Sequence, residues 1–151
     1  MKSSALQGIF LTALENRKKL EHIAKEYNGP VYVTYLDALG RYGLITDVPD
    51  ALQCATLGDS TVLETPHGAI EFYNLPEDFF FGYHKNGNLL PIAEPEKSLI
   101  DALMLSEQEG IIPAWLENLD WRDLDLKKLN QYAERMGISN FYEYLSYSRV
   151  S

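Results

Sequence analysis

The sequence contains a single cysteine, Cys54, among its 151 residues. No disulfide can therefore form within the chain, and a cysteine-based metal site is excluded. So little cysteine is typical of a protein that does not depend on an oxidising compartment, and we expect this one in the cytoplasm. Cys54 lies in the apolar run ALQCATLG, which predicts a buried thiol rather than a reactive one.

Basic residues are also scarce. The chain has 13 lysines and arginines against 22 aspartates and glutamates, a net charge of −9. A protein that binds nucleic acid directly usually presents a basic face to the phosphates. The one basic cluster, Arg17-Lys18-Lys19 with Lys25 further on, alternates with glutamates and is interpreted as a solvated helix face. We therefore expect no direct nucleic-acid binding, whereas an acidic surface suits a basic protein partner.

Long hydrophobic runs and catalytic motifs are absent as well. No apolar run approaches the roughly 20 residues that a membrane helix needs, so we expect no membrane partner. The three histidines, His22, His67 and His84, have no metal-ligand spacing. The chain has no P-loop, no G-x-G-x-x-G, no G-x-S-x-G and no C-x-x-C. We predict no metal, no cofactor and no catalytic residue.

The two ends of the chain carry helical patterns. Apolar residues recur at three- and four-residue spacing over residues 4–27, and YNGP ends that segment. A short extended VYV leads into TYLDALGRYGL, a predicted helix with Thr34 as its N-cap. From Pro95 onward, helices are predicted in PEKSLIDALML, IPAWLENL, LDLKKLNQYAERMG and FYEYLSYS. Asn140 and Glu143 have capping-box spacing for the last of these.

Residues 51–93 change to strand patterns in LQCATL, STVLET, AIEFYNL and LLPIA. The alternation of Ile70 and Phe72 with polar neighbours is typical of a half-buried antiparallel strand. Pro91 indicates an edge or irregular position, and PEDFFFGYH predicts a short helical turn whose phenylalanines pack into the sheet. The sequence thus predicts one α+β domain, residues 1–151, with a small, mostly antiparallel sheet packed by N-terminal and C-terminal helices.

The segment IAEPEKSLIDALML gathers four ionisable residues, Glu94, Glu96, Lys97 and Asp101. They could form an active site, or they could begin and flank an ordinary helix. Pro95 suits a first helical turn, where the two glutamates would each stabilise the helix dipole by about 0.3–1 kcal/mol. Lys97 and Asp101 have the spacing of a helical ion pair. We favour the structural interpretation. If the segment has a functional role, we expect Lys97 and Asp101 to carry it as exposed partners of an interface or a small ligand.

Tyrosine is abundant, with ten residues, three of them close to the C-terminus. Tyrosine is favoured at interfaces because it buries a large area and keeps a polar tip, although tyrosines can also surround a small core. The candidate interaction residues are therefore the charged and tyrosine clusters together: Lys97, Asp101, Glu94, Glu96, Tyr142, Tyr144 and Tyr147.

The order of the segments resembles one family. YVTYLDALGRYGLI, ETPHGAIEFYNLPEDFFFGYH and LLPIAEPEKSLIDALML, in this order, resemble the C-terminal domain of AbiEi-type antitoxins. These are predicted transcriptional regulators of bacterial type IV toxin–antitoxin systems. In that family a helix ending Y-G-L, a T-P-x-G turn, a phenylalanine–glycine segment and an I-A-x-P-E-K-A-L-x-D helix follow one another. The resemblance covers about residues 20–148, which divides the domain into an extension, 1–19, and a matched region, 20–151.

The resemblance implies a non-enzymatic antitoxin, part of a phage defence, that opposes a nucleotidyltransferase-like toxin by interaction or by indirect antagonism. Family members begin with a winged helix-turn-helix domain, whereas only residues 1–19 precede the matched region here. We therefore expect no operator binding by this chain alone. A winged-helix protein acting in trans is a second expected partner, and a homodimer is a further option.

Two other functions stay open. One is a DNA-binding transcriptional regulator that acts with a partner or through the helix at Arg17–Lys19. The other is a small hydrolase or phosphotransfer enzyme that uses Glu94, Glu96, Asp101 or His84.

Overall fold

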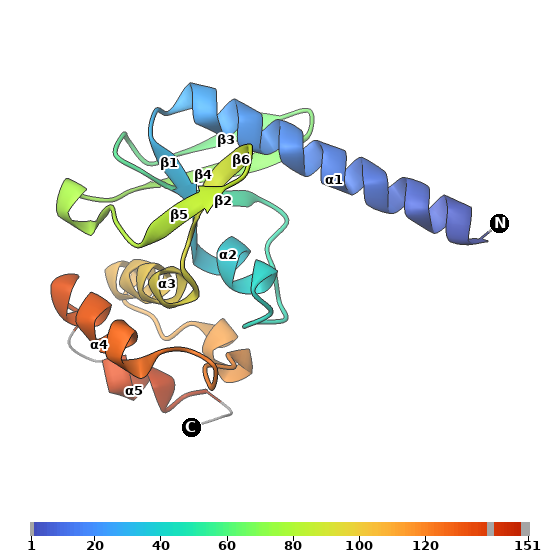
Figure 1. Cartoon of the computed structure of the whole chain (residues 1–151). Coiled ribbons are helices and arrows are strands. Elements are labelled where there is room, and N and C mark those ends of the chain that lie inside the picture. Colours follow the sequence, from blue (N-terminus) through green and yellow to red (C-terminus); the bar gives the residue numbers. More distant parts are fainter. Residues whose placement is uncertain (1, 139–140, 149–151) are drawn as a thin grey trace.

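The computed structural model describes residues 2–138 and 141–148, without the side chains of residues 2–6, 9 and 10. It confirms the predicted α+β class: a six-stranded mixed sheet lies between α1 and the remaining helices (Figure 1). In chain order the elements are α1 (Lys2–Tyr27), β1 (Val31–Val33), α2 (Tyr35–Arg41), β2 (Leu52–Thr56), β3 (Thr61–Thr65), β4 (Gly68–Asn74), the 3-10 helix η1 (Glu77–Phe79), β5 (Tyr83–Asn86), β6 (Leu89–Ala93), α3 (Pro95–Glu109), the 3-10 helix η2 (Ala114–Asn118), α4 (Leu126–Arg135) and α5 (Phe141–Leu145).

The strands are ordered β3-β4-β2-β1-β6-β5. Three of the five pairings are antiparallel, and β1–β6 and β2–β4 are parallel. The strand β4 buries Ile70 and Phe72 and leaves Glu71 and Tyr73 half-buried, as the alternation predicts. It is antiparallel to β3 but parallel to β2, so β2 and β3 are consecutive in the chain and are not neighbours in the sheet.

Pro91 lies at an irregular point of the sheet rather than at an edge. The strand β6 is flanked by β1 and β5, and β5 is the edge strand. His84 pairs with Ile92 and Asn86 with Leu89, so β6 contributes one residue more than β5 between these two pairs. Such a bulge accommodates a proline because the ladder is interrupted where its N–H is missing.

The two faces of the sheet have separate cores. On one face Leu20 and Ala24 of α1 pack with Cys54, Ile70 and Phe72, and the cysteine is buried as predicted. On the other face Tyr32, Ala55 and Ala93 are covered by the phenylalanines around η1 and by the end of α3, which confirms the predicted helical turn and its packing. In the described ranges, no helix is both long enough and apolar enough to cross a membrane.

A third core lies between α2, α3, α4 and α5, below the sheet in Figure 1. The helix α3 ends at Gly110, which adopts the left-handed conformation typical of a C-cap. Asp125 caps α4 by accepting from the backbone N–H groups of Lys127 and Lys128. The segment IPAWLENL forms the 3-10 helix η2 rather than an α-helix. The predicted capping box depends on Asn140, which is outside the described residues.

Candidate functional site

Glu94 and Pro95 begin α3 where the sequence predicts. Pro95 occupies the first turn, where its missing N–H leaves no hydrogen bond unmade. The backbone N–H of Glu94 donates to the Gly82 carbonyl (2.8 Å), which joins the start of the helix to the segment before β5. This start places Lys97 and Asp101, one and two turns further on, against the sheet and η1.

Lys97 and Asp101 are buried, so the prediction that they are exposed is wrong. Neither side chain has any solvent-exposed surface. The Lys97 ammonium donates to Asp101 Oδ1, to the Tyr32 hydroxyl (2.9 Å) and to the Phe79 carbonyl (2.9 Å). It also lies 4.6 Å from the centroid of the Phe81 ring, within cation–π range. All three N–H groups of the ammonium are therefore used.

Asp101 is as completely paired as Lys97. Its Oδ2 accepts from the Tyr32 hydroxyl (2.9 Å) and from the Thr34 hydroxyl (2.7 Å). Thr34 holds the predicted N-cap position of α2, but its side chain makes no capping hydrogen bond and turns to Asp101 instead. Burial raises the pKa of Asp101 and lowers the pKa of Lys97, and the ion pair opposes both shifts.

The backbone beside this cluster is strained. Tyr35 follows Thr34 with a φ of +61°, the one positive φ outside glycine in the described residues. A bulky residue in this region costs about 1–3 kcal/mol and needs firm packing to hold it. That packing comes from Tyr73, whose ring centroid lies 4.9 Å from that of Tyr35.

The space near the cluster is small. A hollow of about 100 Å³ lies between Tyr35, Tyr73 and α3, and Asp101 is among the residues that line it. Ligand pockets usually measure about 300–1,000 Å³, so this hollow has room for only a few water molecules. The buried cluster of Lys97, Asp101, Tyr32 and Thr34, termed the sealed cluster below, is a structural site.

Glu94 and Glu96 connect α3 to α4. The Glu94 carboxylate accepts from Lys128 Nζ (2.8 Å) and from the Tyr132 hydroxyl (2.5 Å). Burial alone would raise the pKa of Glu94, but these two hydrogen bonds lower it. Glu96 is buried and accepts from the backbone N–H of Asp125 (3.0 Å) at the start of α4. Because both glutamates are bonded to residues at the start of α4 or along it, they support the interpretation that the charges of this segment stabilise the fold.

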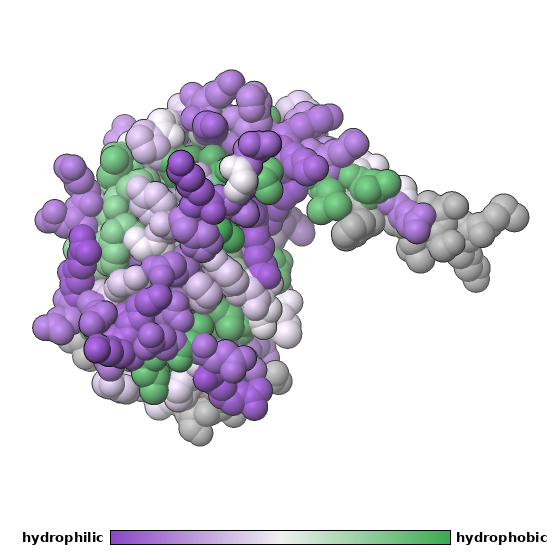
Figure 2. All heavy atoms as spheres, in the orientation of Figure 1, coloured by the Kyte–Doolittle hydropathy of each residue, from purple (hydrophilic) through white to green (hydrophobic). Residues whose placement is uncertain are grey.

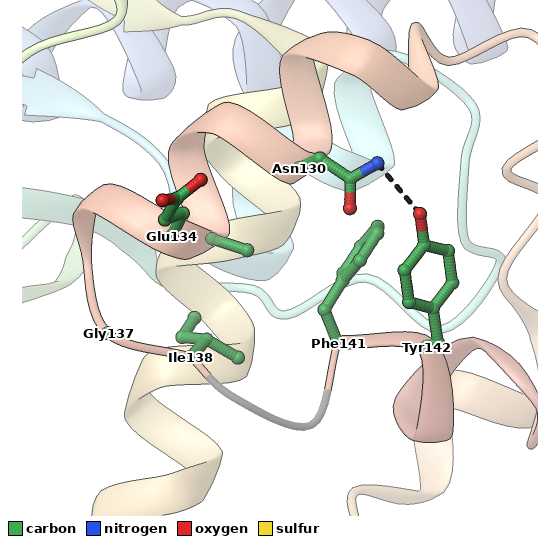
Figure 3. Close-up of a pocket in the computed structure, with 7 residues that line it drawn as sticks. Asn130, Glu134, Gly137, Ile138, Phe141 and Tyr142 are labelled. Atoms are coloured by element: carbon green, nitrogen blue, oxygen red, sulfur yellow. Dashed lines mark hydrogen bonds between the residues drawn. The ribbon is translucent and has the colours of Figure 1, made fainter.

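The three tyrosines near the C-terminus differ in exposure. Tyr142 is 64% exposed and Tyr147 is also exposed, whereas Tyr144 is half-buried against the third core. Figure 3 shows Tyr142 beside a hollow of about 520 Å³ between α4 and α5, where its hydroxyl accepts from Asn130 Nδ2 (2.8 Å). Among the described residues that line this hollow, Glu134 is the one carboxylate, and none is a nucleophile paired with a base. An interface role for Tyr142 and Tyr147 stays a prediction.

A second buried charge cluster was missed by the sequence analysis. Asp37 on α2 is fully buried, and its carboxylate accepts from Arg17 of α1, from Arg41 Nε (3.1 Å) and from the backbone N–H of Gln53 (3.1 Å). The prediction that Arg17 belongs to a solvated face is therefore wrong, because its guanidinium fixes α1 to the body. Only the aspartate–arginine spacing within α2 signals this cluster in the sequence.

One more carboxylate lies near that cluster. Glu21 is buried, and its Oε1 lies 3.9 Å from Arg41 Nη1. This oxygen is the one buried side-chain polar atom in the described residues without a hydrogen-bond partner. Burial raises the pKa of Glu21, while Arg41 acts in the opposite direction.

The helix α1 projects beyond the body of the protein, and Figure 1 shows its N-terminal half without a covering element. Leu11 is 57% exposed and Leu14 43% exposed. Figure 2 shows hydrophobic surface on this part of α1. Leu20 and Ala24, about two to four turns further along, are buried against the sheet. The exposed pair Leu11 and Leu14 is termed the α1 patch below.

The histidines lie on three different elements. His22 on α1 is exposed, and its Nε2 lies 3.3 Å from Glu26 Oε1. His67 lies in the β3–β4 turn and His84 on β5. The described part of the chain contains no group of three His, Cys, Asp or Glu side chains that could hold a metal ion. The carboxylates of the hypothetical enzyme site do not meet around a common space. Asp101 is buried in the sealed cluster, and Glu94 and Glu96 are hydrogen-bonded to α4.

Comparison with known proteins finds no match: no protein-family model, no curated protein and no solved structure matches this chain. The resemblance to AbiEi-type antitoxins therefore stays a prediction from the residues alone.

Proposed function

We propose that this protein is an antitoxin-like interaction protein that opposes a nucleotidyltransferase-like toxin and acts in the cytoplasm. The order of the sequence segments motivates the class of activity. The single structural observation that carries the interaction is the α1 patch, in which two leucines are exposed on a helix that projects from the body. Apolar side chains grouped on an uncovered helix are typical of a surface that a partner buries.

The charge distribution supports the same surface. The helix α1 and Met1 carry five lysines and arginines against three aspartates and glutamates, whereas the rest of the chain carries eight against nineteen. Lys18 and Lys19 are exposed close to the patch along the helix. A partner that covers α1 would therefore combine an apolar groove with acidic residues at its rim, since complementary charges steer association and fix its register.

The sealed cluster speaks against catalysis by Lys97 and Asp101. A catalytic group must reach a substrate within hydrogen-bond distance, directly or through one water molecule. The polar atoms of Lys97 and Asp101 are instead all bonded within the protein and have no exposed surface. The chemistry of this segment is that of a fold-stabilising ion pair.

Co-expression with the product of the adjacent gene, scored for growth and for copurification, tests the proposal. Wild type should copurify with that protein, and Leu11→Glu with Leu14→Glu should abolish copurification. Both leucines are exposed, so the circular dichroism and thermal melt of this variant should match those of wild type. The matched control is Val62→Glu, an equally exposed apolar residue on the edge strand β3. Copurification that survives the α1 substitutions contradicts the assigned surface, and rescue of growth without copurification contradicts direct interaction.

The second expected partner, a winged-helix protein, is tested with the same variants. If that protein is bound through the α1 patch and the toxin is not, the chain acts as the regulatory subunit of a DNA-binding complex. Gel shifts on its upstream DNA, with and without the winged-helix protein, would then show salt-sensitive binding only for the mixture.

A further inference from the structure

A hollow of about 560 Å³ opens at the β5–β6 edge of the sheet. Its volume lies within the range of about 300–1,000 Å³ that is usual for small-ligand pockets. The residues that matter for its chemistry come from three elements and the segment before β5: Lys25, Phe80, Tyr83, Lys85, Asn86 and Pro91. This space is termed the β5 hollow.

An aromatic shelf forms one wall of the β5 hollow. The Tyr83 ring is stacked on the buried Tyr32 ring, with centroids 4.7 Å apart and an interplanar angle of 15°. Phe80 contacts Tyr83 edge-on at 5.3 Å and Tyr32 at 4.9 Å, which holds the shelf in place. Tyr83 remains 40% exposed. A fixed aromatic ring with an open part is a platform on which a further planar ring can stack.

Two free cations flank the shelf. Lys25 and Lys85 are exposed, and among the described residues neither forms a hydrogen bond or an ion pair. Within the described part of the chain, no aspartate or glutamate lines the β5 hollow, although the chain as a whole carries a net charge of −9. A smaller hollow of about 220 Å³ adjoins it, shares Lys25, and adds Lys18 and His22; its one carboxylate is the buried Glu21. This corner is therefore a basic concavity on an acidic protein.

We propose that the β5 hollow binds a mononucleotide, with the base stacked on Tyr83 and the phosphate held by Lys25 and Lys85. The aromatic shelf supplies a surface on which any of the bases can stack, because every base has a π-face. The lysines supply charge-assisted hydrogen bonds to the phosphate oxygens. Asn86 offers an amide that can donate and accept at a base edge. The same chemistry fits a free nucleotide and the terminal nucleotide of an RNA. This site is independent of the proposed antitoxin function.

An added peptide strand fits this edge less well. The edge strand β5 has four residues, pairs with β6 through a bulge and presents Lys85, and these are three of the features by which proteins prevent strand pairing at an edge. The observations therefore favour a ligand that enters the hollow over one that extends the sheet.

Isothermal titration of the purified chain with AMP and GMP tests the site, with adenosine, inorganic phosphate and a short single-stranded RNA as companion probes. We expect a dissociation constant below about 1 mM for a mononucleotide and weaker binding of adenosine and of phosphate alone. Lys25→Ala with Lys85→Ala should weaken binding at least about tenfold. Lys19→Ala with Lys127→Ala, two exposed lysines outside the hollow, is the matched control and should bind as wild type does.

Tyr83→Leu keeps an apolar side chain over Tyr32 and should also weaken nucleotide binding, while its melting temperature shows whether the fold is retained. RNA that binds more tightly than the mononucleotide, with the same loss in the lysine variant, identifies a terminal nucleotide as the ligand. Absence of mononucleotide and RNA binding overturns the proposal, as does binding that the lysine variant leaves unchanged. Phosphate that binds as tightly as AMP overturns the role of the aromatic shelf.

Discussion

Lys97 and Asp101 form an ion pair one helical turn apart on α3, and neither side chain has solvent-exposed surface. The pair is completed by hydroxyls from Tyr32 on β1 and from Thr34 just beyond it. Removal of two charges from water carries a desolvation cost of several kcal/mol per ion, which the ion pair and its hydrogen bonds must offset. The cluster therefore connects β1, η1 and α3, and loss of one charged partner should cost more than loss of both.

Lys97→Met should destabilise the fold by about 3–5 kcal/mol, because it leaves the Asp101 carboxylate buried without its counter-charge. Lys97→Met combined with Asp101→Leu should cost less than the sum of the single changes, with a coupling of about 1–3 kcal/mol. Urea denaturation of the four proteins measures the cycle. Additive effects would show that the two groups do not stabilise each other.

Gly82→Ala should be more damaging than Gly110→Ala. Both glycines have a positive φ, 75° and 72°, so alanine is strained at either position. An added Cβ at Gly82 would meet Lys97 Cγ at 2.9 Å, whereas nothing lies within 4 Å at Gly110. The backbone strain costs about 1–2 kcal/mol in both variants, and only Gly82→Ala should add a further loss from the displaced Lys97. Equal losses in denaturation experiments would contradict close packing at Lys97.

Glu21→Gln should change how stability depends on pH. Burial raises the pKa of Glu21 above its ordinary value of 4.5, so the folded state holds the proton more tightly than the unfolded state. The free energy of unfolding should therefore fall as the pH rises from 4.5 through the raised pKa. The variant lacks this fall, and its stability relative to wild type should be higher at neutral pH than at pH 4.5. The exposed Glu15→Gln on the same helix is the control, and a constant difference between the Glu21 variant and wild type would contradict the prediction.

Asp37→Asn should loosen α1 from the body. The substitution weakens the charge-assisted hydrogen bonds from Arg17 and Arg41, each worth about 1.5–3 kcal/mol. Amide hydrogen exchange along α1 should accelerate more than exchange in the strands, because local opening of the helix becomes easier. The exposed Asp47→Asn provides the comparison. Unchanged protection of α1 would show that the apolar contacts of Leu20 and Ala24 alone hold it.

Much of the fold follows from local patterns. The start of α3 at Pro95 and the end of the long helix at YNGP are encoded by residues next to one another, so periodicity and capping rules predict them. The order of strands does not follow in this way. The strand β4 inserts between β2 and β3, and the parallel β2–β4 pairing depends on contacts that no local pattern specifies.

The site shows the same division. The spacing of Lys97 and Asp101 predicts an ion pair, and the structure has one. Its burial was not predictable, because Tyr32 and Thr34 come from 69 and 67 positions away in the chain and charged residues are rarely buried. Asp37 was missed for the same reason, since its partner Arg17 belongs to a different helix. The exposure of the α1 patch depends on where the body ends, which helical periodicity does not indicate.

The central claim is that the chain acts through the α1 patch and not through chemistry at the EPEK segment. Its most direct test is growth of cells that express the toxin together with wild type, with Leu11→Glu plus Leu14→Glu, or with Lys97→Met plus Asp101→Leu, each variant first shown to be folded. We predict that wild type and the sealed-cluster variant restore growth and that the α1 variant does not. Growth restored by the α1 variant and lost with the folded sealed-cluster variant would contradict the account.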